Sequence, residues 1–471
     1  MKIGVFGIGL AAYWPQFEGL RERLEGYQRG IEARLEAMGA EVISAGLVDT
    51  AQAARQAGET LAAARLDLVL LYTATYATSS QVLPTVQAVD APVIILNLQP
   101  TRTLDYEAMT TGEWLANCSA CCVPEIAGAF TRARIHYRTV TGTLLDEDPA
   151  WDALGEWLDA ASAVRSLRTA RIGFLGHTYP GMLDMYSDFT QVHAQTGAHV
   201  EVLEIDDLVE RVESADAGTI ERKGEEIRQT FDLAAAGVDP IAAEITPEIF
   251  EWSARVAVGL DRLVEDFELD GLTYYYRGVG NNIAERVTAG LIVGNSLLTA
   301  RGVPAAGEGD LKTNLAMLLL DRLGCGGSYT EFYALDFDDE FILMGHDGPG
   351  HLAIAEGRPV ARALQLYHGK AGAGLSIEMK VRLGPVTILG VTQTAEGGLK
   401  LVAAEGESIA GPTFWIGNTN SRIRFHSGPA AFFDAWCAEG PTHHVALGVG
   451  QQVSRLRKVA DLLGLELTVV E

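Results

Sequence analysis

The chain is poor in the features that mark secreted, membrane-bound and nucleic-acid-binding proteins. It has five cysteines in 471 residues, and an odd number in so long a chain implies no disulfide framework. Basic residues are scarce: 36 Lys and Arg against 62 Asp and Glu give a net charge of −26, which opposes binding to nucleic acid or anionic membranes. No apolar run reaches the length of a membrane span, and the first residues show no cleavable signal pattern. We therefore expect a cytoplasmic protein.

Two cofactor motifs are also incomplete. Gly7 and Gly9 resemble part of a dinucleotide-binding loop, but the third glycine of that fingerprint is missing. Cys118, Cys121 and Cys122 resemble a zinc or redox motif, yet no second cysteine pair follows at a plausible spacing. Packed free thiols are the better interpretation of these cysteines. Neither motif predicts a bound cofactor.

The length and the apolar pattern predict several domains. A chain of 471 residues is too long for one hydrophobic core. Residues 1–165 alternate between helical stretches, such as 17–38 and 50–64, and apolar β-prone runs at 3–8, 41–45, 66–72 and 92–98. This alternation predicts a parallel sheet with helices on both faces.

A second α/β unit begins at residues 170–176 and includes strand-like runs at 199–205 and 271–276 and a helix at 283–298. After residue 325, apolar and polar residues alternate along the runs 374–383, 386–393 and 399–404. Gly-rich turns separate these runs, a pattern typical of antiparallel sheets. The predicted fold is α/β, with two Rossmann-like α/β domains (1–165 and 166–325) followed by an antiparallel β-barrel-like domain (326–471).

The first candidate site residue is Glu308, on the glycine-flanked turn Gly307-Glu308-Gly309-Asp310. A carboxylate there can approach a ligand without steric hindrance from its neighbours. The alternative is that Asp310 only caps the following helix and leaves Glu308 in solvent. This segment alone favours the alternative, because Asp is a preferred N-cap residue.

Further candidates are Glu331, His346 and the pair His443-His444, with His351 as a weaker one. Glu331 has apolar neighbours, and a carboxylate buried there needs a partner or a metal. Adjacent histidines on a strand point to opposite faces, so one could ligate a metal while the other contacts substrate. Two Glu and one or two His make an oxygen-rich site that suits Mn²⁺ or Mg²⁺ better than structural zinc.

Taken together, these segments resemble the L-arabinose isomerase branch of the arabinose/fucose isomerase superfamily. The similarity is best from about residue 271 onward. The segment GEGDLKT at 307–313, which contains Glu308, is similar to the family's glutamate-bearing turn. Glu331 follows a Gly-Gly pair, as the family's second catalytic glutamate does, and His346 matches a family histidine at a strand end. THHVAL at 442–447 matches the C-terminal Ala-His-His segment of that family.

The resemblance implies a metal-dependent aldose–ketose isomerase that converts a free sugar through a cis-enediol, with Mn²⁺ as the metal. It implies that Glu308 and Glu331 are catalytic and that both also bind the metal, together with His346 and His444. It further implies that His443 and Met182 contact the substrate. It also implies a trimer-based homo-oligomer, up to a hexamer, with active sites at subunit interfaces.

The N-terminal half departs from the family pattern. Residues 9–12 offer no amide where the family has a sugar-contacting glutamine, and a family histidine is replaced near Cys121. The metal chemistry therefore transfers better than the identity of the sugar. Two alternatives stay open: an isomerase or epimerase of a modified sugar, and a non-catalytic sugar-binding protein. No Lys/Arg cluster lies near the motifs, which argues against a phosphorylated sugar as the substrate.

Overall fold

The computed structural model describes all residues except 239–240, 278–281, 364–365 and 368–369. It separates into two compact units, Met1–Arg165 and Ser166–Glu471. Each unit is described by itself below. The division of the second unit into residues 166–325 and 326–471 stays a prediction. None of the helices in the described part of the chain combines the length and the apolar character needed to span a bilayer.

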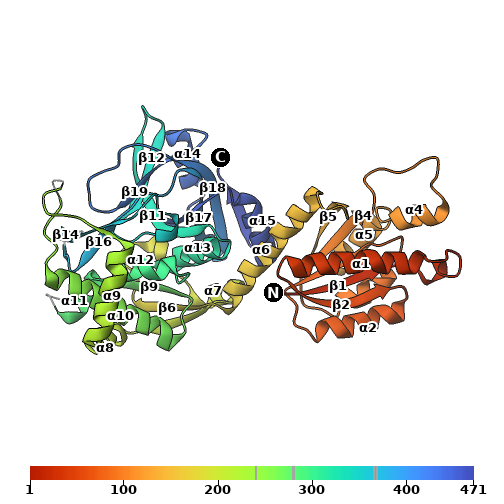
Figure 1. Ribbon diagram of the computed structural model, residues 1–471, viewed down its shortest axis with the longest axis horizontal. Coiled ribbons are helices and arrows are strands. Elements are labelled where there is room, and N and C mark those ends of the chain that lie inside the picture. Colours follow the sequence, from red (N-terminus) through yellow and green to blue (C-terminus); the bar gives the residue numbers. More distant parts are fainter. Residues whose placement is uncertain (239–240, 278–281, 364–365, 368–369) are drawn as a thin grey trace. The chain divides into compact units, whose positions relative to one another are not determined.

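The first unit is a parallel sheet with helices on both faces, as the strand–helix alternation predicts. The strand order is β2-β1-β3-β4-β5, and every pairing is parallel. In Figure 1 the helices α1 (Leu20–Ala37) and α2 (Ala51–Ala62) lie on opposite sides of this sheet. The strands are β1 (Lys2–Ile8), β2 (Glu41–Val48), β3 (Leu68–Tyr72), β4 (Val93–Gln99) and β5 (Tyr137–Thr143).

One face of this sheet carries the core of the unit. Phe6, Leu71 and Ile95 pack there against Leu61 of α2 and Phe130 of α5, all of them fully buried. The central strands β1, β3 and β4 are apolar at most positions because helices cover both faces. The remaining helices of the unit are η1 (Ala11–Tyr13), η2 (Ser79–Gln81), α3 (Leu83–Val86), α4 (Thr111–Asn117), α5 (Val123–Ala133) and α6 (Pro149–Thr169), the last crossing the boundary between the units.

The second unit contains a smaller parallel sheet of order β10-β9-β6-β7. Its strands are β6 (Arg171–Gly176), β7 (His199–Leu203), β9 (Gly271–Tyr275) and β10 (Ala305–Ala306). The helix predicted over 283–298 is two helices, α11 (Ile283–Ala289) and α12 (Ile292–Ala300), because Gly290 ends the first. The other helices here are η3 (Leu183–Met185), α7 (Phe189–Thr196), α8 (Ile205–Glu213), α9 (Ala217–Thr230) and α10 (Pro247–Phe267).

A mixed sheet of order β17-β20-β11-β12-β19-β18-β21 forms the C-terminal part of this unit. Its pairings are antiparallel, as predicted, except that β21 runs parallel to β18, so the sheet is mixed. β17 also pairs with β18; the barrel-like shape stays a prediction. The strands are β11 (Gly326–Asp336), β12 (Phe341–His346), β17 (Gly384–Gln393), β18 (Leu399–Ile409), β19 (Thr419–Arg424), β20 (His444–Val449) and β21 (Glu466–Val469).

The run 374–383 does not join this sheet. Its strand β16 (Leu375–Glu378) pairs with β13 (Val360–Ala363), which also pairs with β8 (Asp232–Leu233). A strand within an alternating run can therefore find its partner in another part of the chain. The remaining elements are η4 (Leu352–Ile354), β14 (Leu366–Tyr367), β15 (Lys370–Ala371), α14 (Pro429–Ala438) and α15 (Val453–Leu463).

Helix α13 (Leu311–Arg322) links the two main sheets of the second unit. It contacts β9 and β10 on one side and β11, β17 and β20 on the other. Residues 311–320 are all buried, which explains why the helix is apolar around most of its circumference. The polar Asn314 fits because its amide donates to the carbonyls of Leu272 (2.9 Å) and Pro304 (2.8 Å).

Packing around α13 should dominate the stability of this unit. We expect Leu318→Ala, which truncates a side chain only 1% exposed, to lower the free energy of unfolding by about 2–5 kcal/mol through lost burial and a residual cavity. The exposed Leu383 serves as the control, since Leu383→Ala should cost less than about 0.5 kcal/mol. Denaturant unfolding of both variants measures this, and equal midpoints would contradict the role of the helix.

Candidate metal centre

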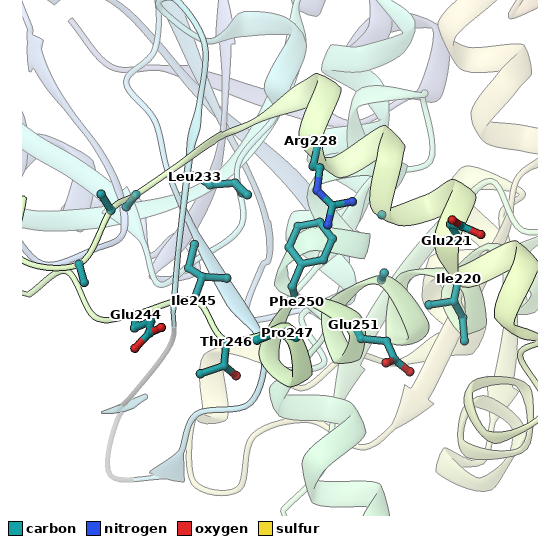
Figure 2. Close-up of a pocket in the computed structure, with 15 residues that line it drawn as sticks. Ile220, Glu221, Arg228, Leu233, Glu244, Ile245, Thr246, Pro247, Phe250 and Glu251 are labelled. Atoms are coloured by element: carbon teal, nitrogen blue, oxygen red, sulfur yellow. The ribbon is translucent and has the colours of Figure 1, made fainter.

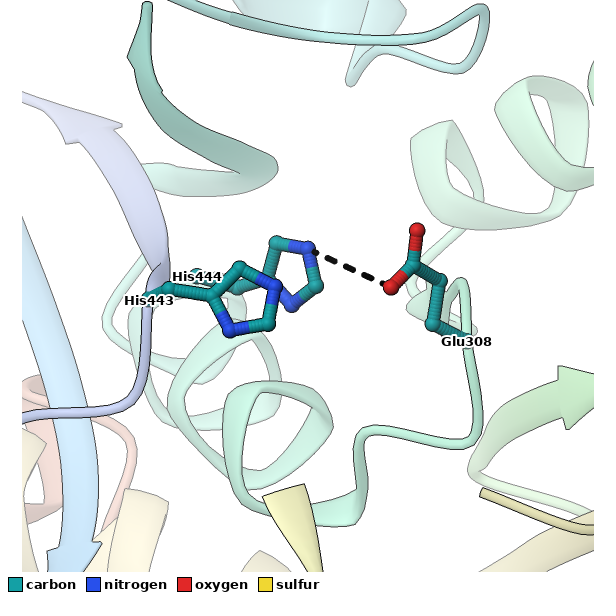
Figure 3. A group of neighbouring side chains, drawn as sticks. All are labelled: Glu308, His443 and His444. Carbon is teal, nitrogen blue, oxygen red and sulfur yellow. Dashed lines mark ion pairs between the residues drawn. The ribbon is translucent and has the colours of Figure 1, made fainter. Parts of the chain in front are cut away.

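Three side chains from two distant segments come together at the start of α13 and β20. Glu308 lies on the turn between β10 and α13, and His443 and His444 lie at the start of β20 (Figure 3). One donor atom from each of the three lies within 4.8 Å of the others. In the part of the chain that the structure describes, no other set of His, Cys, Asp or Glu meets this criterion.

The turn that carries Glu308 is strained and firmly held. Glu308 has φ 61°, in the left-handed region that non-glycine residues seldom adopt, at a cost of about 1–3 kcal/mol. Its carbonyl accepts a hydrogen bond from Tyr179 N (2.8 Å), and Gly309 N donates to the Tyr274 carbonyl (3.0 Å). A Cβ at Gly309 would lie 2.6 Å from the carbonyl oxygen of His177, so only glycine fits. Neighbouring backbone therefore fixes the direction in which Glu308 points.

His444 is fully buried, and its ring is held from one side. Its Nδ1 lies 3.0 Å from Oδ2 of Asp310 and 2.6 Å from the hydroxyl of Tyr329. An ionised carboxylate only accepts hydrogen bonds, so Nδ1 carries the proton and Nε2 presents its lone pair. A carboxylate behind a histidine in this way is common among metal ligands.

The opposite nitrogen of His444 faces Glu308. Nε2 lies 3.9 Å from Oε2 of Glu308 (Figure 3), and among the described residues neither buried atom has a hydrogen-bond partner. Buried polar atoms without partners are rare because they lose the hydrogen bonds of water. A cation between them would satisfy both, so the residues present fit a divalent metal.

Asp310 both caps a helix and contacts His444. It caps α13, accepting from Thr313 N (3.0 Å) and Thr313 Oγ1 (2.7 Å), and it holds His444. Burial raises the pKa of Asp310, but the bonds from His444 and Thr313 outweigh it and lower the pKa overall. The predicted cap is thus confirmed. Glu308, however, is not left in solvent, since its side chain is only 24% exposed.

His443 lies beside His444 rather than on the opposite face. The two ring centroids are 3.8 Å apart. The expectation of opposite faces is wrong because β20 begins at His444, so the alternation of a strand does not extend to His443. Nδ1 of His443 lies 2.6 Å from Oδ2 of Asp184, in η3. Burial raises the pKa of Asp184, and the bonds from His443 then lower it below its ordinary value.

Two other predicted residues, His346 and Glu331, lie beside this group. His346 ends β12, and its Nε2 lies 4.0 Å from Oε1 of Glu308. Glu331 of β11 stands directly opposite His444 of β20, so the two side chains share one face of the sheet. Met182 comes just before η3, in the same short segment as Asp184.

The weaker histidine candidate lies elsewhere. His351 is buried with Nε2 3.5 Å from Asp321, and it is not part of the donor group.

The pKa values of both glutamates at the site are raised. Burial raises the pKa of Glu308, the histidines lower it in part, and the nearby Glu331 and Asp310 raise it again. Burial also raises the pKa of Glu331, against the effect of His443. Carboxyl groups with raised pKa values are suited to accept and return protons near neutral pH.

A pocket opens beside Glu308 and His346. Its wall is aromatic, with Tyr179 and Tyr275 in tilted contact at 4.6 Å between ring centroids. Aromatic walls with a few polar groups suit small molecules that have both C–H faces and hydroxyls. The run 274–276, at the end of the strand-like run predicted over 271–276, supplies three of the tyrosines that line this pocket: Tyr274, Tyr275 and Tyr276.

A larger hollow lies between α9 and α10, away from these residues. Arg228 lies over the ring of Phe250 at 4.2 Å, and Leu233 and Ile245 add apolar surface (Figure 2). Among the described residues, its lining contains no convergent group of metal donors. The donor group at Glu308 is therefore the better candidate for a catalytic centre.

Two contributors to the site were not found from the sequence. Tyr329 stands two residues before Glu331 on the same strand and so faces the same side, a period-two signal that could have identified it. Asp184 is 259 residues away from His443 in the chain, and no spacing or motif connects them.

Comparison with known proteins points to one kind of enzyme. No family model matches the chain. An L-arabinose isomerase of Nocardioides sp. is 25% identical over 417 residues, which cover 86% of this chain and 80% of the relative. Another L-arabinose isomerase, of Acidothermus cellulolyticus, is 23% identical over 392 residues, 82% of this chain and 76% of the relative. These matches support a distant L-arabinose isomerase-like relationship.

Solved structures add nothing to this relationship. A periplasmic solute-binding protein of an ABC transporter from Actinobacillus succinogenes, with bound D-allose, covers 65% of this chain and is itself covered to 77%. The identity is 13% and the TM-score 0.17, too low to indicate a common fold.

The pair Asp310–His444 predicts a pH-dependent contribution to stability. Because the folded pKa of Asp310 lies below its ordinary value of 3.8, the contribution is complete above that value and disappears as pH falls through the folded pKa. We expect metal-free Asp310→Asn to be less stable by about 1.5–3 kcal/mol at neutral pH, with the difference from the parent shrinking in acid. Denaturant unfolding over a pH series measures it; a difference independent of pH would contradict the role of the charge.

Proposed function

We propose that the chain is a metal-dependent aldose–ketose isomerase that acts on a free sugar through a cis-enediol intermediate. One observation carries the proposal: the buried, unpartnered Oε2 of Glu308 and Nε2 of His444 face each other at 3.9 Å, beside a tyrosine-lined pocket. The distant relationship to L-arabinose isomerases supports the same chemistry.

Manganese is the metal that we propose for this site. Glu308, Glu331, His346 and His444 would hold it, a mixture of carboxylate oxygens and imidazole nitrogens that suits Mn²⁺. When bound, the ion supplies positive charge that stabilises the enediolate as negative charge develops.

Glu308 and Glu331 move the proton between C1 and C2 of the sugar. Burial raises the pKa of both carboxyl groups, which favours the acid form more than in a free glutamate, and their roles exchange with the direction of the reaction. A positioned acid–base group gives about 10²–10⁴-fold in rate, so orientation of the sugar supplies much of the rest. We assign that orientation to Met182 and the tyrosine-lined pocket.

The assembly is proposed on the resemblance alone, and the location follows the expectation from the sequence. We propose a trimer-based homo-oligomer, up to a hexamer, in which a neighbouring subunit completes each active site, and a cytoplasmic location.

A second candidate is an isomerase or epimerase of a modified sugar. It is favoured by the sugar contacts that the family pattern has and this chain lacks, at residues 9–12 and near Cys121. The metal and carboxylate chemistry would be the same, and only the substrate would differ.

The isomerase proposal predicts turnover that depends on both glutamates. We expect Mn²⁺-dependent conversion of at least one sugar in a panel of unmodified pentoses, hexoses and deoxy sugars. Glu308→Gln and Glu331→Gln should each lower its rate by about 10²–10⁴-fold, because a positioned proton-transfer group is lost. Glu356→Gln, at an exposed position, is the matched control and should leave the rate unchanged.

Other outcomes separate the alternatives. Normal turnover in folded, metal-loaded Glu308→Gln and Glu331→Gln would refute the mechanism. No turnover across the panel by the Mn²⁺-loaded parent would favour the modified sugar. Sugar binding that resists a chelator would favour a binding protein.

Metal binding itself should stabilise the folded chain. Since only the folded state brings the donors together, Mn²⁺ at about 100 times its Kd should add about 2.7 kcal/mol to the free energy of unfolding. A chelator should remove the increment, and His444→Ala should never show it. Thermal unfolding with and without Mn²⁺ measures this, and a melting temperature insensitive to Mn²⁺ in the parent would contradict the site.

A further inference from the structure

We propose that Asp184 is a positioning residue that makes His443 a ligand of the metal rather than a substrate contact. The inference rests on the proposed function in one respect, that the site binds a divalent metal. It assigns a role to Asp184, and it adds a donor to the predicted set of Glu308, Glu331, His346 and His444.

The first observation is that one oxygen of Asp184 holds His443 at two points. Oδ2 accepts from the backbone N of His443 (3.0 Å) and lies 2.6 Å from Nδ1 of its ring. With the backbone and the ring fixed together, the imidazole can turn only slightly about its side-chain bonds. The ring nitrogen farther from the backbone then points towards Glu308, as Figure 3 shows.

The second observation is that the segment carrying Asp184 is itself anchored in the core. Lys312 is only 2% exposed, and its ammonium donates to the backbone carbonyls of Asp184 and Tyr186. A buried ammonium needs such acceptors because it has lost its water. Lys312 lies on the first turn of α13, two residues after Asp310. The same end of one helix therefore sets the position of both carboxylates that hold the histidines.

The third observation is the likeness of the two carboxylate–histidine pairs. Asp184 meets Nδ1 of His443 as Asp310 meets Nδ1 of His444. In each pair the proton lies on Nδ1 and the lone pair on Nε2, the form that binds metals. The pairs differ in exposure: the side chain of His443 is 35% exposed and that of His444 is 1% exposed. Packing adds to Asp310 in orienting His444, whereas the more exposed His443 depends on Asp184.

Replacement of Asp184 tests the inference through metal affinity. We expect Asp184→Asn in the full chain to bind Mn²⁺ about 10–100-fold more weakly in calorimetric titration, the usual effect of losing a carboxylate behind a metal-bound histidine. Asp184 is partly exposed, so the variant should fold. The control is Asp188→Asn: Asp188 caps α7 (accepting from the backbone of Thr190 and Gln191) and touches no histidine among the described residues, so its Mn²⁺ affinity should equal the parent's.

A second measurement reports on the ring without metal. In nitrogen NMR of the metal-free chain, His443 should carry its proton on Nδ1 in the parent and in Asp188→Asn, and should lose that preference in Asp184→Asn. A role confined to folding would leave this signature unchanged.

Three results would overturn the inference: Asp184→Asn with unchanged Mn²⁺ affinity, Asp184→Asn with weaker sugar binding only, or a parent chain that binds no Mn²⁺. A parent that binds Mn²⁺ but converts no sugar would refute the isomerase proposal while this test still decides the role of Asp184.

Discussion

The buried contact between Asp310 and His444 is the interaction on which the rest of the second unit depends. It joins the first turn of α13 to the start of β20, and α13 packs between the two main sheets. Losing a hydrogen bond to a buried charged group costs about 1.5–3 kcal/mol. The contact that orients the histidine thus also fixes the helix around which both sheets are built, so stability and site geometry share one origin.

The site contains a strained backbone conformation and buried polar atoms without hydrogen-bond partners in the described part of the chain, and the surrounding structure offsets the free energy that these features cost. Glu308 adopts a left-handed backbone, and its Oε2 and Nε2 of His444 have no hydrogen-bond partner among the described residues. Such departures persist only where the neighbouring structure over-determines them, and they concentrate at functional sites. Here the turn is held by its backbone bonds to Tyr179 and Tyr274 and by the buried run 311–320 that follows it.

Strong local patterns were readable from the sequence, and long-range pairing was not. The apolar runs of the first unit predicted β1 to β4 because each run is bounded by a helical stretch. The helix α10 was missed although Thr246 caps it and Pro247 begins it, two recognised start signals. The site residues differ in the same way. Glu308 and His444 lie in sequence motifs, whereas the side of His443 was predicted wrongly because β20 begins one residue later, at His444. No local sequence signal indicates that Asp184 contacts His443.

The glycine after Glu308 has a consequence for redesign of this protein. A Cβ at Gly309 would strike the backbone of His177 and Thr178, so neither a library nor a natural lineage can change that position without rebuilding both segments. The tyrosines that line the pocket are held by side-chain contacts, such as the bond from Asn295 Nδ2 to the Tyr274 hydroxyl (3.0 Å), and no left-handed backbone fixes them. Changes in substrate specificity should therefore arise by substitution of the tyrosines that line the pocket, while Gly309, in the turn that presents Glu308, stays unchanged.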